Sequence, residues 1–314
     1  MQSKQFIYSL LILFVIKVNA QQEPQFSDYK LNISSFNPAF AGFYDGSVML
    51  IHRTQFVGID GAPQAQNLNL NLPINVNMGV GFNVINQSLG VTDETIITGD
   101  YSYSIYTNDI TMLTFGLKAG VHVLNVDYTR LNIYDPSDMS FGTNIEGEVS
   151  PRIGAGVLLT TPKWFLGVST PNFLNKNYNP TIEGSTGVSK PHFYFMTGYN
   201  TFLTEEIIFR PSILSRAVAG APLAIDLALN FDYQDKFRFG VSYRWDAAIS
   251  AIAGISVGKN IQVGYSYDYL TGALGKFSSG SHQFYMKFTF KRSDELRRIC
   301  NCSFTDNPDS TLGY

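Results

Sequence analysis

Residues 223–246 read LAIDLALNFDYQDKFRFGVSYRWD, in which two alternating runs flank a short polar turn. Every second residue is apolar across 223–231 and again across 237–245. This period of two indicates β-strands with one apolar face. The opposite face of each run carries charge, for example at Asp226 and Arg238. The stretch therefore predicts a β-hairpin with an apolar side and a charged side.

The same alternation recurs from one end of the chain to the other. The clearest runs are about ten residues long, which is the length that a tilted strand needs to cross the hydrocarbon core of a bilayer. Strands of soluble proteins usually have about five or six residues, so the length favours a membrane barrel over a soluble sandwich. We expect about fourteen strands, an even number as in bacterial single-chain barrels, with approximate spans 47–57, 63–72, 77–86, 94–106, 109–124, 149–161, 163–170, 192–203, 205–215, 222–233, 236–246, 248–258, 260–270 and 281–291.

The charged face of these strands supports the same conclusion. Asp, Arg and Lys are costly in the dry core of a soluble sandwich, whereas they are ordinary in the lumen of an outer-membrane barrel. Charged residues make up 15% of the chain and aromatic residues 14%, while soluble domains average about 25% charged residues. The sequence thus predicts an all-β fold, a transmembrane antiparallel outer-membrane β-barrel, with lumen-facing candidates at Asp100, Lys118, Asp226, Arg238, Arg244, Asp268 and Lys287.

Connections between the predicted strands tend to alternate in length. Those after even-numbered strands are short, whereas the two longest, 125–148 and 171–191, follow odd-numbered strands. Outer-membrane barrels have short periplasmic turns and longer outer loops. An even strand count returns the chain to the side on which it started, so we expect both termini in the periplasm. We also expect the wall to close, because an open edge in lipid leaves N–H and C=O groups unpaired.

The first twenty residues have the composition of a signal peptide. Lys4 precedes an apolar run, and small residues stand before a cleavage point after Ala20. The apolar run is shorter than the about 20 residues that a membrane-spanning helix needs. Residues 1–20 are therefore predicted to be removed on export.

Two further segments flank the predicted barrel, which covers residues 46–291. Residues 21–45 are polar and rich in turn formers. They either fold into the lumen as a plug or form an ordered periplasmic lead-in. Residues 292–314 are predicted to be a periplasmic tail, and they hold both cysteines of the chain, Cys300 and Cys302.

Motifs for catalysis, metal binding or nucleic-acid binding do not stand out. The net charge is −3 without a basic block, which argues against nucleic acid as a partner. No Cys or His neighbour with metal-ligand spacing accompanies any of the four histidines, which are His52, His122, His192 and His282. We therefore expect no enzyme activity, no metal and no cofactor. The mixed signs of the lumen charges favour a closed or narrow lumen over a wide, water-filled pore.

Several short motifs, in order along the mature chain, resemble the PorP/SprF family of Bacteroidetes. One departure is Phe56, where the family usually has Trp. The resemblance covers the mature chain nearly end to end and is carried by Gln25, Phe26, Ser27, Tyr29, Asn37, Pro38, Ala39, Phe40, Ala41, Gly42, Arg53, Gln55, Phe56, Gly58, Gly61, Ala62, Pro63, Pro211, Ser212, Gly240, Ser242, Tyr243, Arg244, Gly264, Tyr265, Ser266, Tyr267, Asp268, Gly280, Ser281 and His282.

The resemblance implies an outer-membrane component of the type IX secretion system. Its implied partners are a secreted adhesin-type protein, bound through that protein's C-terminal domain, or the periplasmic ring and peptidoglycan-linked lipoproteins of the machine. Outer-membrane lipid is expected around the barrel. From topology, we expect a surface partner near the Ala62–Pro63 hairpin and the loops 125–148 and 171–191, and a periplasmic partner near residues 21–45 and 292–314. A passive channel or small-solute transporter is the alternative.

Overall fold

The computed structural model describes residues 25–43, 45–131, 144–174, 176–177 and 188–290. The predicted signal peptide and the predicted C-terminal tail with its two cysteines lie outside the described residues. So do the middle portions of both long connections.

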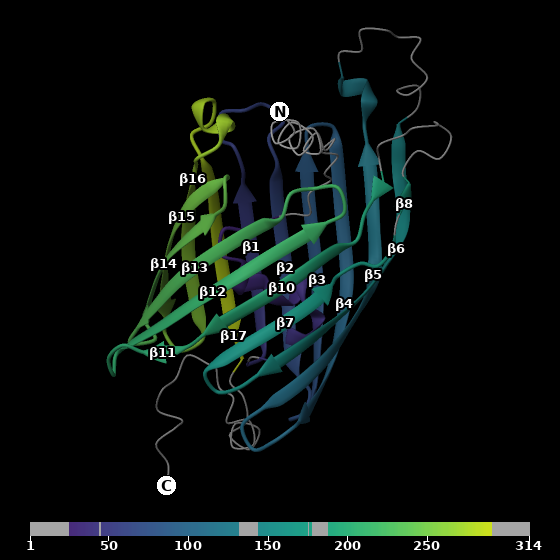
Figure 1. Cartoon of the computed structure of the whole chain (residues 1–314). Coiled ribbons are helices and arrows are strands. Elements are labelled where there is room, and N and C mark those ends of the chain that lie inside the picture. The colour runs from purple at the N-terminus through teal and green to yellow at the C-terminus, as the bar shows by residue number, and fades with distance from the viewer. Residues whose placement is uncertain (1–24, 44, 132–143, 175, 178–187, 291–314) are drawn as a thin grey trace, which may run out of the picture.

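The described chain forms a closed antiparallel β-barrel (Figure 1), as the alternating runs predict. Wall strands pair with their neighbours in sequence, and β17 pairs with β1 to close the wall. Fourteen strands make up this wall, with β11 a two-residue continuation of β10, and β8 and β9 pair separately. The strands are β1 (Ser47–Thr54), β2 (Gln64–Pro73), β3 (Met78–Leu89), β4 (Thr92–Tyr106), β5 (Met112–Val126), β6 (Ile145–Thr160), β7 (Trp164–Thr170), β8 (Lys176–Asn177), β9 (Val188–Ser189), β10 (His192–Tyr199), β11 (Thr201–Phe202), β12 (Ile207–Val218), β13 (Ala224–Tyr233), β14 (Phe237–Arg244), β15 (Ala248–Val257), β16 (Ile261–Leu270) and β17 (Ser281–Thr289).

Three strands extend beyond their predicted boundaries next to glycines with a positive φ. β3 and β4 continue beyond their predicted ends and join through Gly90 and Val91, because Gly90 adopts the φ of 60° that a tight hairpin turn requires. β6 begins at Ile145 and not at residue 149, since an irregularity in its pairing with β5 accommodates Gly147, whose φ is 62°. Local backbone freedom at two glycines thus lengthens three strands.

The two rims of the barrel differ in their connections. At the loop rim, uppermost in Figure 1, lie residues 271–280 and the described ends of the connections 127–144 and 171–191. The connection 127–144 begins with a short 3-10 turn, η3 (Tyr128–Arg130), where hydrogen bonds from Thr129 lower the pKa of the Asp127 carboxyl. At the opposite rim, here called the turn rim, β1 begins and β17 ends, and the connections are the short stretches 74–77, 107–111, 161–163, 203–206, 234–236 and 258–260.

Side chains alternate across the wall as the sequence pattern predicts. On β13, Leu227 and Leu229 point outward and are exposed, whereas Ala228 and Asn230 point inward and are buried. Exposed aromatic side chains gather near both rims, with Trp164, Tyr199, Tyr233 and Phe288 near the turn rim and Tyr243, Trp245 and Tyr269 near the loop rim. An apolar band between two aromatic girdles is the outer face that membrane barrels present to lipid.

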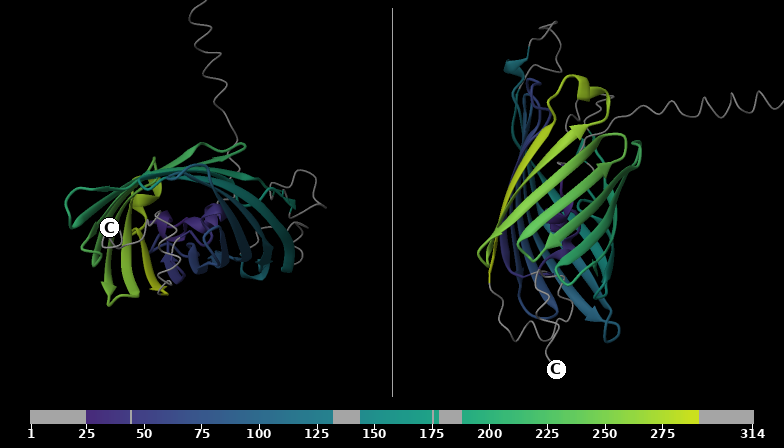
Figure 2. Two further views of the ribbon diagram at one scale, coloured as in Figure 1. Left: turned by 90° about the horizontal axis from the view of Figure 1, so that it is seen from below. Right: turned by 90° about the vertical axis from the view of Figure 1, so that its left-hand side faces the viewer.

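Residues 25–43, here called the inner segment, lie within the barrel before β1 begins (Figure 2). The segment consists of three short turns, η1 (Tyr29–Asn32), α2 (Ile33–Phe36) and η2 (Pro38–Phe40). In the described part of the chain, no helix is long and apolar enough to cross a membrane. Most side chains of the inner segment are buried, so this segment is the core of the molecule.

The first and last described residues lie toward opposite rims, and both chain termini lie outside the described residues. Phe26 is held by Arg244 at the loop-rim end of β14, and β17 ends at the turn rim. The inner segment therefore passes along the lumen before the first strand. Near the turn rim it reaches Asn71 of β2, whose side chain accepts a hydrogen bond from the amide of Gly42.

Candidate functional site: the occupied lumen

Two capping residues set the local shape of the inner segment. The Asp28 carboxylate accepts a hydrogen bond from the amide of Lys30 at 3.1 Å and so caps η1. Asn37 does the same for η2, accepting from the amide of Ala39 at 3.0 Å, and Pro38 follows it at the first position of the turn. Asp and Asn are preferred caps, and proline is favoured directly after a cap. The sequence N-P-A therefore favours a compact turn at this point.

Four inward-facing glycines of the wall receive this turn. They are here called the glycine seat: Gly79 on β3, Gly116 on β5, Gly156 on β6 and Gly167 on β7. A Cβ added at the first three would overlap with atoms of Ala41, Ala39 and Asn37 respectively, and one at Gly167 would lie 2.9 Å from the Asn37 amide nitrogen. Only glycine allows so close an approach of two chains. The inner segment thus packs against the wall as closely as neighbouring elements pack in a protein core.

Hydroxyl groups of the wall donate hydrogen bonds to backbone carbonyls of the inner segment. Ser169 donates to the carbonyl of Phe36 at 2.8 Å, and Ser102 donates to the carbonyl of Ala41 at 2.6 Å. In the opposite sense, the side chain of Asn37 donates to the carbonyl of Val157 at 3.2 Å. Buried backbone groups need such partners. The small polar residues on the inner face of the wall supply them to the inner segment.

Apolar clusters pack on both sides of the inner segment. Phe36 and Phe40 contact Tyr194 and Phe165 of the wall, with ring centroids 5.2 and 5.6 Å apart. The larger cluster consists of Tyr29, Ile33, Phe36, Ala39, Phe40, Leu158, Phe165, Tyr194, Met196, Leu214 and Ala228. The second consists of Phe26, Leu31, Met49, Ile51, Ala65 and Tyr285. The lumen at these levels is therefore a packed apolar core.

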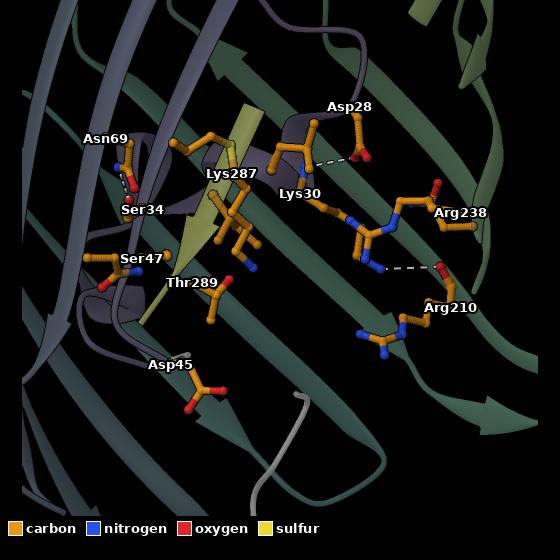
Figure 3. A pocket seen from close by; sticks show the side chains of 15 residues that line it. Asp28, Lys30, Ser34, Asp45, Ser47, Asn69, Arg210, Arg238, Lys287 and Thr289 are labelled. Atoms are coloured by element: carbon orange, nitrogen blue, oxygen red, sulfur yellow. Dashed lines mark hydrogen bonds between the residues drawn. The ribbon is translucent and has the colours of Figure 1, made fainter. Parts of the chain in front are cut away.

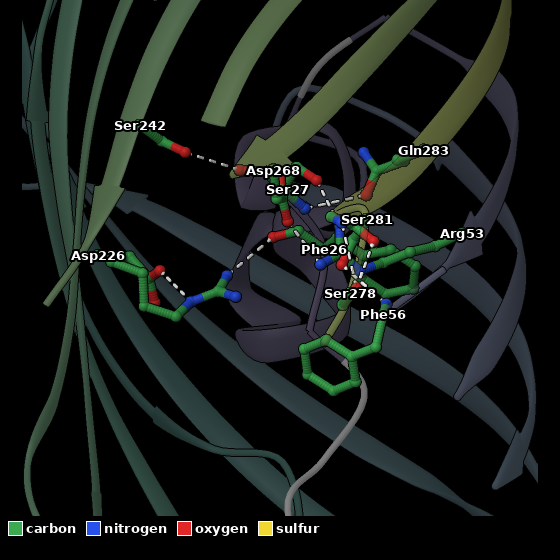
Figure 4. A network of polar contacts seen from close by, with 12 residues as sticks. Phe26, Ser27, Arg53, Phe56, Asp226, Ser242, Asp268, Ser278, Ser281 and Gln283 are labelled. Atoms are coloured by element: carbon green, nitrogen blue, oxygen red, sulfur yellow. Dashed lines mark hydrogen bonds and ion pairs between the residues drawn. The ribbon is translucent and has the colours of Figure 1, made fainter. Parts of the chain in front are cut away.

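Ser27 is held at the loop-rim end of the inner segment by three strands (Figure 4). Its amide donates to Gln283 of β17 at 2.9 Å, and its carbonyl accepts from Ser242 of β14 at 3.2 Å. Its hydroxyl accepts from Arg53 of β1. Arg53 in turn pairs with Asp268 at 2.6 Å, and both side chains are almost fully buried. We call this set of Ser27, Gln283, Ser242, Arg53 and Asp268 the Ser27 clamp.

The seven charged residues singled out in the sequence all lie on the inner side of the wall. Asp100 pairs with Lys118 at 2.6 Å, and Arg244 pairs with Asp226 at 2.6 Å. Arg244 also donates to the carbonyl of Phe26 at 3.3 Å. The remaining three separate, with Asp268 in the Ser27 clamp, Arg238 paired with Asp232, and Lys287 near the turn rim.

The residues of the family resemblance fall into three places. Gln25, Phe26, Asn37, Pro38 and Gly42 belong to the inner segment, and Arg53 and Asp268 belong to the Ser27 clamp. The β1–β2 connection contains Phe56 and Gly61, which have φ of 49° and 71°, together with Ala62 and Pro63. Tyr267 and His282 lie on the outer face near the loop rim, with ring centroids 5.3 Å apart. The residues of the inner segment and of the Ser27 clamp therefore lie together in the lumen. The residues of the β1–β2 connection and the pair Tyr267 and His282 lie apart from them.

Several residues that contact the inner segment are not among the lumen residues predicted from the sequence. Asn69 donates to Ser34 at 2.9 Å and Asn83 accepts from Ser35 at 3.0 Å, so both hold the middle of the inner segment. The strand of Asn69, β2, alternates Asn with Leu, and such uncharged amides are a sequence signal that a prediction based on charged residues misses. Asp232 pairs with Arg210 at 2.9 Å and with Arg238 at 2.8 Å.

A cavity of about 90 Å³ remains between the inner segment and the wall near the turn rim (Figure 3). It is lined by Asp28 and Lys30 of the inner segment and by residues of β1, β2, β12, β13, β14 and β17. Four lining side chains are cationic, namely Lys30, Arg210, Arg238 and Lys287. Across the described ranges, no three His, Cys, Asp or Glu side chains come together as metal ligands.

Comparisons with known proteins identify one family and several similar solved structures. The family model described as type IX secretion system membrane protein PorP/SprF matches residues 18–288. Among solved structures, the chain is similar to the Acinetobacter baumannii outer membrane protein Omp33, at 9% identity over 79% of this chain and 98% of that one, with a TM-score of 0.46. It is also similar to a Pseudomonas aeruginosa FadL homologue, at 15% identity over 82% and 94% of the two chains, with a TM-score of 0.43. A triple mutant of Rhodopseudomonas blastica porin matches at 10% identity over 78% and 99%, with a TM-score of 0.35. No curated protein matches the chain.

Proposed function

Because the chain belongs to the PorP/SprF family of type IX secretion system membrane proteins, we propose that it serves this system as a rigid outer-membrane scaffold that docks a secreted surface protein. The coarse assignment, an outer-membrane component of the type IX system, follows from the family match and the barrel fold. The docking role is the proposal. The partner is an adhesin-type protein, recognised through its C-terminal domain.

The occupied lumen is the observation that carries this proposal. A transport channel needs an open path, whereas here the inner segment seats on wall glycines, packs into two apolar clusters and is clamped at Ser27. A barrel with a filled lumen holds its loops in fixed positions, where a partner can bind them. Binding residues are commonly carried by loops that a rigid scaffold positions, and the longest connections are both on the loop rim.

A passive channel is the alternative, and steady open conductance of the purified chain in a planar bilayer would favour it. The periplasmic ring is a second possible partner of the same scaffold. It would meet the turn rim, where the connections are short, whereas a surface protein would meet the loop rim.

Replacing residues 178–187 with a short Gly-Ser linker should abolish surface display of one cargo while the barrel still folds. The described flanks stay in place, because Pro171 packs across Gly154 and Lys190 donates to the carbonyl of Ala219 at 3.0 Å. Cargo display is measured by antibody labelling of intact cells, and folding by heat-modifiable migration on gels. The matched control replaces residues 107–111 at the turn rim with Asn-Gly, and it should leave display unchanged. Normal display after the 178–187 replacement would remove this loop from the docking site.

A further inference from the structure

The cavity near the turn rim has a charge arrangement that the filled lumen does not require. Its lining contains four cationic side chains and two carboxylates, those of Asp28 and Asp45. Asp232 stands behind two of the cations, so the local sum of four positive and three negative charges is positive. Lys30, Arg210, Arg238 and Lys287 are all half-buried. Solvent therefore reaches the cations, although the wall and the inner segment surround them.

Other residues hold the cations in fixed positions. Asp232 accepts a hydrogen bond from Nε of Arg238 at 2.8 Å and forms an ion pair with Arg210, with Nε of Arg210 2.9 Å from Oδ2 of Asp232. Lys30 donates through Nζ to the carbonyl of Arg210 at 3.2 Å. Figure 3 shows Lys30 and Lys287 reaching the cavity from the inner segment and from β17. A cluster that is oriented before a ligand arrives loses little conformational entropy on binding.

Two buried acceptors in the same lining have no hydrogen-bond donor. The Oδ1 atom of Asp28 accepts from the amide of Lys30, while its Oδ2 atom has no partner, although only 1% of the residue is exposed. Asn230 is 3% exposed, and its Oδ1 atom also has no partner. A buried acceptor without a donor destabilises the fold. The cavity therefore presents cations that attract an anion together with acceptors that need an N–H group.

We propose that this cavity binds a segment of polypeptide through one carboxylate, with backbone N–H groups of the same segment donating to Asp28 and Asn230. A peptide carries both a carboxylate and N–H donors within a few bonds of each other. Inorganic phosphate also pairs with the cations, but it has no N–H group, and its one or two O–H groups at neutral pH replace the donors of a peptide only in part. The volume of about 90 Å³ admits one such group and excludes a folded domain. This inference concerns the turn rim and does not depend on the docking role of the loop rim.

The test is calorimetric titration of the full mature chain in detergent micelles at low ionic strength. The probes are acetylated triglycine with a free carboxylate, its C-terminal amide, an acetylated Gly-Asp-Gly amide, and inorganic phosphate. We expect saturable binding of at least one of the two carboxylate peptides, no binding of the triglycine amide, and little competition from phosphate. Comparing the two carboxylate peptides distinguishes a chain terminus from an acidic side chain as the source of the carboxylate.

Variants separate a built site from general attraction. Lys287→Gln and Lys30→Gln should each weaken binding about tenfold, which corresponds to about 1.4 kcal/mol. The control is Lys259→Gln, the same charge change at an exposed residue of the turn rim outside the cavity. Equal loss in the control would overturn the proposal.

Asp28→Asn tests the N–H donors. The side-chain oxygen of Asn still caps η1. At the position of Oδ2, the acceptor without a partner, Asn has either an NH2 donor or an uncharged oxygen. If a peptide N–H group binds there, the variant weakens binding. If the cavity only attracts anions, loss of the carboxylate strengthens binding, and the proposal is wrong. Binding of phosphate as tight as that of the peptide, or no binding of either carboxylate peptide, would overturn it as well.

Discussion

Arg53→Met should lower the free energy of unfolding by about 3–5 kcal/mol, because it leaves the carboxylate of Asp268 buried without its cation. The pair is 2.6 Å long, and Asp268 is 1% exposed. The same substitution removes the donor to the hydroxyl of Ser27, so it also loosens the loop-rim end of the inner segment. Urea unfolding in a bilayer-like environment, followed by the fluorescence of the two tryptophans, measures the change.

The double variant Arg53→Met with Asp268→Asn identifies the cause. It should recover most of the lost stability, since no unpaired buried charge remains. Arg130→Met is the matched control, because Arg130 is exposed in the 127–144 connection, and it should change the free energy of unfolding by less than about 0.5 kcal/mol. An effect of Arg53→Met as small as that of the control would show that the clamp does not hold the fold.

Gly116→Val should destabilise the barrel by about 3 kcal/mol, the upper end of the usual cost of overpacking. The added side chain would overlap with backbone atoms of Pro38 and Ala39, and a capped turn cannot move aside as a flexible side chain can. The inner segment must shift or leave its seat. The same urea unfolding assay measures the loss.

Gly99→Val is the matched control for this prediction. Gly99 lies on the neighbouring strand β4 but is exposed on the outer face, where an added Cβ would lie 4.0 Å from the carbonyl oxygen of Ala119. Valine there should be neutral or slightly stabilising. Equal losses at both positions would mean that the cost comes from the strand itself and that the glycine seat has no special role.

The barrel wall was predictable from the sequence because its signal is local. Lipid on one side and the lumen on the other impose a period of two on each strand, so inward residues such as Asp226 and Arg238 could be assigned strand by strand. Strand ends were less predictable. Phe56 reads as a strand residue, yet β1 ends at Thr54 because Phe56 adopts a positive φ.

The interior was not predictable to the same extent, because its contacts join residues distant in sequence. Arg53 and Asp268 are 215 positions apart, and they meet only when β17 closes the wall between β1 and β16. Likewise, Gly116 looks like any glycine in a strand until Ala39 is placed against it. Period-two patterns specify which face a residue occupies, but they do not specify what that face contacts.

Hydrogen–deuterium exchange of the intact chain in detergent or nanodiscs, read by mass spectrometry, tests the occupied lumen most directly. The amides of Ser27, Ala39 and Gly42 are hydrogen-bonded in the barrel interior. Peptides covering residues 25–43 should therefore exchange as slowly as peptides from the wall strands β4 and β5. Exchange of residues 25–43 as fast as that of the exposed residues 128–131 would show that the lumen is not filled by this segment, and the scaffold account would fail with it.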